Sequence, residues 1–117
     1  MSGLSMVLGA FTWNLNAAQK NDKIWGYVTF EGKSYQFWGR RATGESGLKA
    51  IKFKRNDDLY NLSNLCMKKV AKGYEHQDIK RDGDEYPGIE KVYPGFIKHM
   101  RSQLMMARLS GSVMSEE

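Results

Sequence analysis

The chain is short and basic, with 117 residues, a formal net charge of +5 and 41% hydrophobic residues. This length fits one domain with one modest core and excludes a two-domain enzyme built on a large cofactor-binding fold. The charge favours an anionic partner, nucleic acid first and a membrane surface second, although solubility alone would also account for a charge of this size.

The first part of the chain predicts antiparallel strands. Residues 1–9 have the small side chains of a leader, and residues 11–15 alternate apolar and polar side chains as a strand does. Residues 23–31 and 33–40 flank Glu31-Gly32, which predicts a tight hairpin turn between two longer strands.

The second strand of this hairpin places its aromatic residues on two faces. Tyr35 and Phe37 share one face, which we expect to be the core side, and Trp38 points to the opposite face. This phase predicts an exposed or half-exposed indole at Trp38.

A loop over residues 42–47 and a fourth strand over Leu48–Arg55 follow the hairpin in the predicted order. The clearest helix signal comes next, with Asn56 or Asp57 as its cap and Gly73 just after its last turn. Its apolar positions recur at helical spacing and its last turn is basic: Leu59, Leu62, Cys66, Val70, then Lys68, Lys69 and Lys72. Cys66 falls on the apolar face, where we expect an inert core thiol.

The last part of the chain predicts less regular structure. Residues 75–95 carry many charged and turn residues, which indicates an irregular wrap, and a second helix is expected from about Pro94 to Arg108. Its stripe of Met100, Met105, Met106 and Leu109 is compatible with a core face or with a surface that binds a protein partner. Residues 111–117 are expected to form a disordered end.

The most informative stretch for function runs from Tyr35 to Arg41, where an aromatic strand ends in Trp-Gly-Arg-Arg. The face of Trp38 suits a sugar or a base, and a guanidinium offers paired donors to phosphate. Gly39 lets the backbone turn sharply or approach a ligand closely. The alternatives without a ligand are a sheet tryptophan that is half-buried for stability and arginines that are ordinary surface charges.

The stretch resembles the WGR domain, a family named after its Trp-Gly-Arg and found in poly(ADP-ribose) polymerases and in stand-alone bacterial and phage proteins. The likeness continues in five further segments: 23–30, 51–54, Lys68–Tyr74, 85–88 and 93–96. Many family members have a second Gly after the triplet, whereas Arg41-Ala42-Thr43 follows here. Contacts of that loop in relatives therefore do not carry over.

The resemblance implies a WGR-like domain over residues 10–96, followed by a C-terminal helical extension and flexible tail over 97–117. The expected fold class is α+β, with a twisted, mainly antiparallel sheet, one long helix packed on it and a C-terminal helix. The implied function is non-enzymatic binding of nucleic acid, duplex DNA near ends or breaks, with little sequence specificity. RNA is an open alternative, with DNA favoured.

Seven residues are the candidate nucleic-acid contacts: Trp38, Gly39, Arg40, Arg41, Lys52, Lys54 and Tyr74. Lys52 and Lys54 belong to a basic segment between Arg40 and Arg55, which would also suit a solvated strand face. Tyr74 follows the helix where relatives place an aromatic residue against the nucleic acid, and packing of the helix end is its alternative role.

A protein-binding module is the alternative function, for example a phage or bacterial regulator of a host enzyme or defence factor, using the sheet or the C-terminal helix. No catalytic set is evident, and we expect no cofactor and no metal. A single cysteine, two histidines without ligand spacing and the acidic residues 78–85 do not make a metal site. We expect no membrane partner and a cytoplasmic protein, in the host cytoplasm if a phage encodes it.

Overall fold

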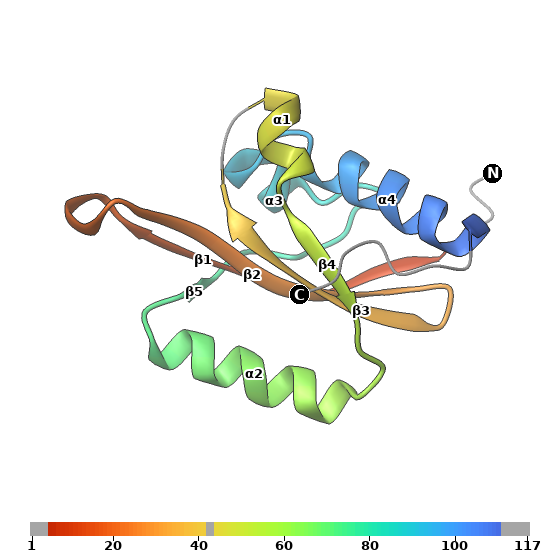
Figure 1. Cartoon of the computed structure of the whole chain (residues 1–117), viewed down its shortest axis with the longest axis horizontal. Helices are drawn as coiled ribbons and strands as arrows, with labels where there is room; N and C mark the ends of the chain where they lie inside the picture. Colours follow the sequence, from red (N-terminus) through yellow and green to blue (C-terminus); the bar gives the residue numbers. More distant parts are fainter. Residues whose placement is uncertain (1–4, 42–43, 111–117) are drawn as a thin grey trace.

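The computed structural model describes residues 5–41 and 44–110 and has three layers. A twisted antiparallel sheet forms the middle layer, one long helix covers one of its faces, and three further helices lie over the other (Figure 1). The predicted α+β class is confirmed. No helix in the described ranges is long and apolar enough to span a membrane.

Within the described chain, five strands form the sheet, in the order β4-β3-β2-β1-β5. Their bounds are β1 Met6–Asn16, β2 Asn21–Phe30, β3 Lys33–Arg40, β4 Lys52–Arg55 and β5 Glu75–His76. The leader predicted over residues 1–9 is wrong for its second half, because β1 begins at Met6. Met6 and Leu8 are buried in the core on either side of the exposed Val7, an alternation that the small neighbouring residues obscured.

The hairpin between β2 and β3 is as predicted. Glu31 and Gly32 have φ values of 50° and 79°, the left-handed pair that a tight two-residue hairpin turn requires. This turn fixes the register, so that Trp25 faces Trp38 and Lys23 faces Arg40 across the two strands.

The helices are α1 Gly44–Lys49, α2 Leu59–Ala71, α3 Pro87–Val92 and α4 Phe96–Ser110, with a short 3₁₀ turn, η1 Ala17–Gln19, between β1 and β2. The fourth strand was predicted to start too early. Leu48 lies in α1 and packs partly buried against the core, and the strand starts only at Lys52. Of the loop predicted over 42–47, residues 42 and 43 lie outside the described part and the rest belongs to α1.

The cap of α2 differs from the prediction. Asp58 is the N-cap residue, and its carboxylate accepts a hydrogen bond from the Asn61 amide at 3.0 Å. Asp57 is turned back toward the sheet, where it accepts from the Ser34 amide at 2.8 Å and pairs with Arg55. Gly73 follows the end of the helix with φ of +107°, as expected.

The main core lies between the sheet and the helices α1, α3 and α4. Phe96, Met100 and Leu104 of α4 are fully buried there with Phe11 and Phe37 of the sheet. Helix α4 thus packs as part of the core. Of its predicted stripe, Met100 is buried, Met105 is partly buried, and Met106 and Leu109 are exposed. The region 75–95, predicted to be irregular, contains β5 and α3, and the expected disordered end lies outside the described residues.

A second, smaller cluster lies between the sheet and α2. It contains Ala10, Trp25, Leu62 and Cys66, all buried, with Trp38 and Tyr74 partly buried at its margin. Cys66 is 6% exposed, and burial raises the pKa of its thiol, which confirms the expected core position.

Candidate nucleic-acid interface

Helix α2 covers only part of its face of the sheet. It packs mainly on β1 and β2 (Figure 1). The segment that leads into the helix lies at the start of β3, where the Asn56 amide donates to the Ser34 carbonyl. The other end of the helix lies near Asn14 on β1. The β3–β4 part of this face therefore stays open. Lys52 and Lys54 are exposed there and Trp38 is half-buried.

Trp38 stands in the middle of a cross-strand row. The row runs Thr12, Trp25, Trp38, Lys52 from β1 to β4, and neighbours in a row point to the same face of the sheet. Thr12 and Trp25 are buried beneath α2, and Lys52 is exposed. The structure thus confirms that Trp38 lies opposite the main core as a half-exposed indole, with an ammonium group in the neighbouring register position.

A second row lies beyond the end of α2. Lys23 and Arg40 face each other across β2 and β3, each two residues from a tryptophan and hence on the same face. Lys69 of α2 lies near enough to Lys23 for the two charges to interact: burial, and then the charges of Lys72 and Lys23, lower the pKa of Lys69. We call Lys23, Arg40, Lys52, Lys69 and Lys72, together with Trp38 and Tyr74, the basic surface.

The cations of the basic surface form no ion pairs within the part of the chain that the structure describes, although the charge of Arg40 also acts on Asp22. No carboxylate there forms an ion pair with Lys23, Arg40, Lys52, Lys69 or Lys72. Mutual repulsion of such cations is relieved when an anion binds between them. The arrangement therefore suits a polyanion that lies across the ends of β2 and β3.

Arg40 and Gly39 form the end of β3. Arg40 is exposed, and one terminal nitrogen of its guanidinium donates to the Lys20 carbonyl at 3.2 Å, which orients the side chain beside the β1–β2 turn. Gly39 has φ of +152°, and a Cβ atom there would lie 3.0 Å from the Ile51 side chain. Its role in the structure is close approach to the segment before β4.

Arg41 has a different position from its neighbour. Its guanidinium donates to both carboxylate oxygens of Asp22, at 3.0 and 3.3 Å, and to the Val92 carbonyl at 2.6 Å. It also lies over the Trp13 ring, 4.2 Å from the centroid, while the Trp13 indole donates to Asp22 at 2.7 Å. Arg41 thus joins the β1–β2 ribbon to α3 and faces away from the basic surface.

Asp22 is the acidic centre of this network. Burial by itself would raise its pKa, but hydrogen bonds from Arg41 and Trp13, with the charges of Arg41 and Arg40, outweigh burial and lower it. The carboxylate is therefore held ionised where it neutralises Arg41.

Tyr74 and Lys54 complete the predicted set. The Tyr74 ring is half-buried, burial raises its phenol pKa, and the Lys69 ammonium lies 5.4 Å from its ring centroid. Lys54 is exposed one row away from Trp38, opposite Gln36. The structure accordingly places Trp38, Arg40, Lys52 and Lys54 on one face of the sheet. Tyr74 packs with Trp38 at the margin of the α2 cluster, and Arg41 is directed to α3.

Sequence reasoning missed Lys23, Lys69 and Lys72 as members of the surface. Lys23 could have been found, because a two-residue turn at Glu31-Gly32 pairs residue 23 with residue 40. Lys69 and Lys72 had been assigned only to the helix end, since periodicity alone does not say which strands a helix crosses.

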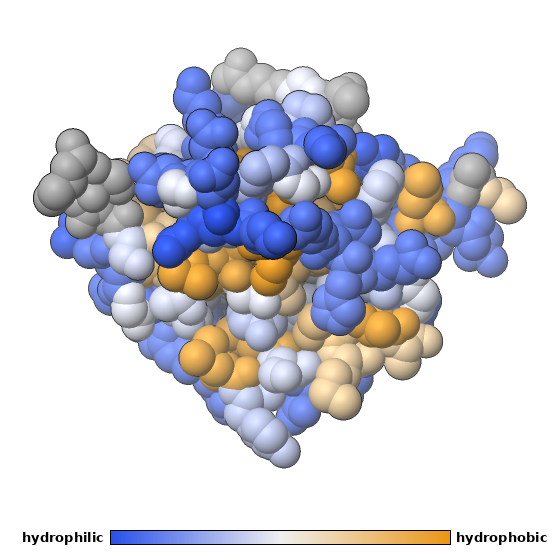
Figure 2. All heavy atoms as spheres, turned by 180° about the vertical axis from the view of Figure 1, so that it is seen from behind, coloured by the Kyte–Doolittle hydropathy of each residue, from blue (hydrophilic) through white to orange (hydrophobic). Residues whose placement is uncertain are grey.

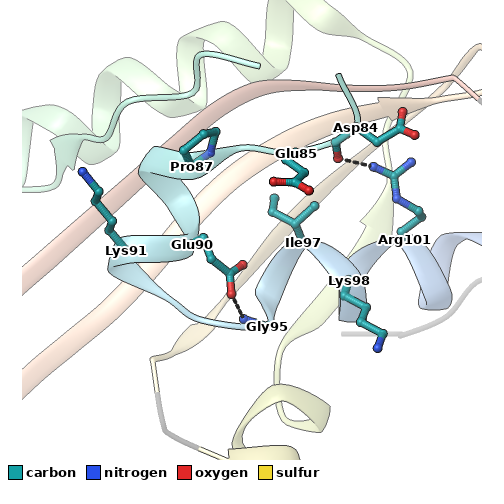
Figure 3. Close-up of a pocket in the computed structure, with 9 residues that line it drawn as sticks. All are labelled: Asp84, Glu85, Pro87, Glu90, Lys91, Gly95, Ile97, Lys98 and Arg101. Carbon is teal, nitrogen blue, oxygen red and sulfur yellow. Dashed lines mark hydrogen bonds between the residues drawn. The ribbon is translucent and has the colours of Figure 1, made fainter. Parts of the chain in front are cut away.

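A separate cleft of about 640 Å³ lies on the other side of the sheet, between the chain before α3, α3 itself and α4 (Figure 3). Ile97 forms part of its floor and acidic and basic side chains alternate around it. Several of these groups serve the fold: Glu90 accepts from the Gly95 amide at 3.0 Å, and Arg101 donates to the Asp84 carbonyl at 2.9 Å. The cleft has no excess of positive charge and does not adjoin the basic surface.

Comparisons of the chain with protein-family models, curated proteins and solved structures gave no match. The likeness to the WGR domain therefore rests on the residues named above. Among the described residues, no group of three or more His, Cys, Asp or Glu side chains is placed to hold a metal ion.

Proposed function

We propose that the chain is a non-enzymatic module that binds nucleic acid, duplex DNA near ends or breaks, with little sequence specificity. The observation that supports this most directly is the basic surface, where a half-exposed Trp38 is surrounded by cations without carboxylate partners among the described residues. Phosphate contacts by such cations release counterions and supply affinity for any sequence.

Trp38 is the reason to expect that the protein prefers duplex ends. Its indole packs against the α2 cluster and stays partly exposed, so part of the ring is available to a sugar or a base. The faces of the bases are stacked on one another inside a continuous duplex, whereas a duplex end exposes the face of its last base pair. Ends and breaks are therefore the places where phosphate contacts and stacking on Trp38 combine.

The test compares three labelled ligands of one sequence: a blunt linear duplex, the same duplex closed by hairpins at both ends, and the single strand. We expect tightest binding to the open duplex and a slope of log K against log salt of about −3 to −4, as contact with about four phosphates would give. Trp38→Ala should weaken binding to the open duplex by about 1–3 kcal/mol and binding to the closed duplex much less. No binding at low salt, or binding that salt does not weaken, would contradict the proposal.

A protein partner is the second candidate, and exposed apolar side chains favour it. Met106 and Leu109, in the last turns of α4, are 59% and 74% exposed although the helix buries its opposite side. A pulldown from lysate with and without nuclease separates the two functions. Partners that disappear after nuclease treatment indicate nucleic acid, and a partner retained by the wild type but lost with Met106→Lys indicates protein binding through α4.

A further inference from the structure

The hairpin of β1 and β2 projects beyond the rest of the sheet. β3 ends at Arg40, opposite Lys23, and β5 pairs only with Thr12 and Trp13, so residues 15–21 have no neighbouring strand on either side of the hairpin. Figure 1 shows this ribbon extending past the helices at the left, and Figure 2, from behind, shows the same projection at the right with hydrophilic residues exposed on it. A large partner can therefore reach the turn without displacing another element.

One face of the projecting ribbon continues the basic surface. Two cross-strand rows, Asn14–Lys23 and Asn16–Asn21, follow one another toward the turn, and Lys23 already belongs to the basic surface. Side chains alternate between the faces of a strand, so both rows point to the face of the basic surface, and Asp22 points to the other face. Asp22 is the single acidic residue between positions 14 and 23, so this face of the ribbon carries amides and a lysine and no carboxylate.

Hydrogen bonds within the turn turn its amide oxygens inward. Oδ1 of Asn16 accepts from the backbone amide of Gln19 at 3.2 Å, and Oε1 of Gln19 accepts from the Asn21 side chain at 3.5 Å. The side-chain NH₂ groups of Asn16 and Gln19 have no acceptor among the described residues, and both side chains are exposed. With the exposed ammonium group of Lys20, the side chains at the turn present hydrogen-bond donors to an external ligand.

The turn and its base are held in place by the fold. Lys20 has φ of 56°, a left-handed conformation that is uncommon for a residue other than Gly, and its carbonyl accepts from the Arg40 guanidinium at 3.2 Å. At the base of the projection, Asp22 accepts from the Trp13 indole and from Arg41. Donors held by such contacts lose little conformational entropy when a ligand binds them.

The minor groove of A·T base pairs is the nucleic-acid surface that matches a set of donors. An A·T pair presents only acceptors there, A N3 and T O2, whereas a G·C pair adds the amino donor of G. In the major groove, every base pair presents a donor beside its acceptors. The minor groove is about 6 Å wide, so the side chains at the turn fit it better than the whole two-stranded ribbon does.

We propose that the turn between β1 and β2 enters the minor groove of bound DNA, where Asn16 and Gln19 donate to the acceptors of A·T pairs. Lys20 and Lys23 then lie near the phosphates that border the groove. This inference rests on the proposed function and adds to it a preference for A·T-rich duplex, without a defined base sequence.

The test uses three blunt duplexes of equal length, with the same base pair at each end and with A·T, G·C or inosine·C pairs in the interior. Inosine lacks the amino group of G, so its pair with C resembles A·T in the minor groove and G·C in the major groove. We expect the A·T and inosine·C duplexes to bind about fivefold tighter than the G·C duplex, as one hydrogen bond of ordinary strength gives. An inosine·C duplex that binds as weakly as the G·C duplex would overturn the proposal.

Two variants test the amides themselves. Asn16→Asp keeps the oxygen that accepts from the Gln19 backbone but loses the NH₂ donor, and Gln19→Ala removes the second donor without a change of charge. Both should bring the affinities for the A·T and G·C duplexes closer together. Asn64→Asp, on the exposed side of α2, is the matched control: it makes the same change of charge and should keep the fivefold ratio.

Circular dichroism checks that all three variants fold. A ratio that neither Asn16→Asp nor Gln19→Ala changes would overturn the proposal, and so would an equal loss of the ratio in Asn64→Asp. Equal, salt-sensitive affinity of the wild type for all three duplexes would overturn it while leaving DNA binding by the basic surface intact. Absence of binding to every duplex at low salt would overturn the proposed function as well.

Discussion

The two faces of the sheet are covered to different degrees. On the face toward α1, α3 and α4, the side chains of Phe11, Phe37 and Phe96 have no exposed surface and pack ring against ring at 5.1–5.8 Å. On the face toward α2, Trp25 is buried while Trp38 and Tyr74 are only half covered. The first face supplies most of the apolar burial, and this leaves the second free to carry cations and an open aromatic ring.

Substitutions at two neighbouring residues of β3 test this difference in burial most directly, because Phe37 and Trp38 point to opposite faces of the sheet. Phe37→Ala removes a fully buried ring from the main core and should lower the free energy of unfolding by about 3–5 kcal/mol. Trp38→Ala removes a half-exposed ring and should lower it by about 1–2 kcal/mol. Urea denaturation of both variants provides the measurement. Equal losses would mean that the α2 face is as closed as the main core.

The adjacent arginines also differ between the two faces, because the Arg41 guanidinium bonds Asp22 and the Val92 carbonyl whereas Arg40 lies on the basic surface. Arg41→Lys keeps the charge but loses the fork that binds Asp22, and we expect a loss of about 1–3 kcal/mol in stability. Arg40→Lys should change stability by less than about 0.5 kcal/mol but weaken DNA binding.

Thermal denaturation and DNA titration of both proteins at one salt concentration provide the measurement. The outcome that would reverse our assignment is a stable Arg41→Lys that has lost DNA binding, together with an Arg40→Lys that binds normally. The guanidinium of Arg41 would then leave Asp22 when the ligand is bound.

Several of these features were accessible from the sequence. The α+β class, the hairpin at Glu31-Gly32, the core position of Cys66 and the face of Trp38 follow from periodicity and turn chemistry, which act within a few residues. The start of β1 was missed because small residues such as Gly9 weaken the alternation that marks a strand. The cap of α2 was placed one or two residues too early, since three neighbouring polar residues can all serve as a cap.

What the sequence could not show depends on contacts between distant segments. Arg41 binds Asp22, 19 positions before it, and Val92, 51 positions after it, and no local pattern links these residues. The lateral position of α2 is a second example. Helical periodicity identifies its buried side but not that it crosses β1 and β2 and leaves β3 and β4 open, which decides how much of Trp38 is exposed.

The network around Asp22 predicts how stability depends on pH. The folded pKa of Asp22 lies below its ordinary value of 3.8, so its ionised form stabilises the fold above that pH, and this contribution is lost as the pH falls through the lower folded value. Asp22→Asn should therefore be destabilised relative to the wild type at neutral pH, and the difference should shrink below about pH 4.

Asp57→Asn is the control for this pH dependence. The Arg55 hydrogen bond and the Ser34 amide lower the pKa of Asp57 to about 2, but its side chain is 53% exposed, so solvent screens the pair and the effect should be smaller. Urea titrations between pH 2.5 and 7 measure both differences. A constant gap between Asp22→Asn and the wild type across this range would show that the carboxylate charge of Asp22 does not contribute to stability.

The smallest expected effect is on the salt dependence of DNA binding, in a comparison of two lysines that lie on opposite sides of the sheet. Lys52 is exposed beside Trp38, and Lys98 is exposed on α4 at the separate cleft. Replacing either by Ala removes one positive charge, so the long-range attraction of the protein for DNA falls equally in both variants. A phosphate contact adds a further change: Lys52→Ala should make the slope of log K against log salt shallower by about one, and Lys98→Ala should leave it unchanged. Equal slopes in the two variants would mean that only net charge matters and that DNA does not select the α2 face over the other.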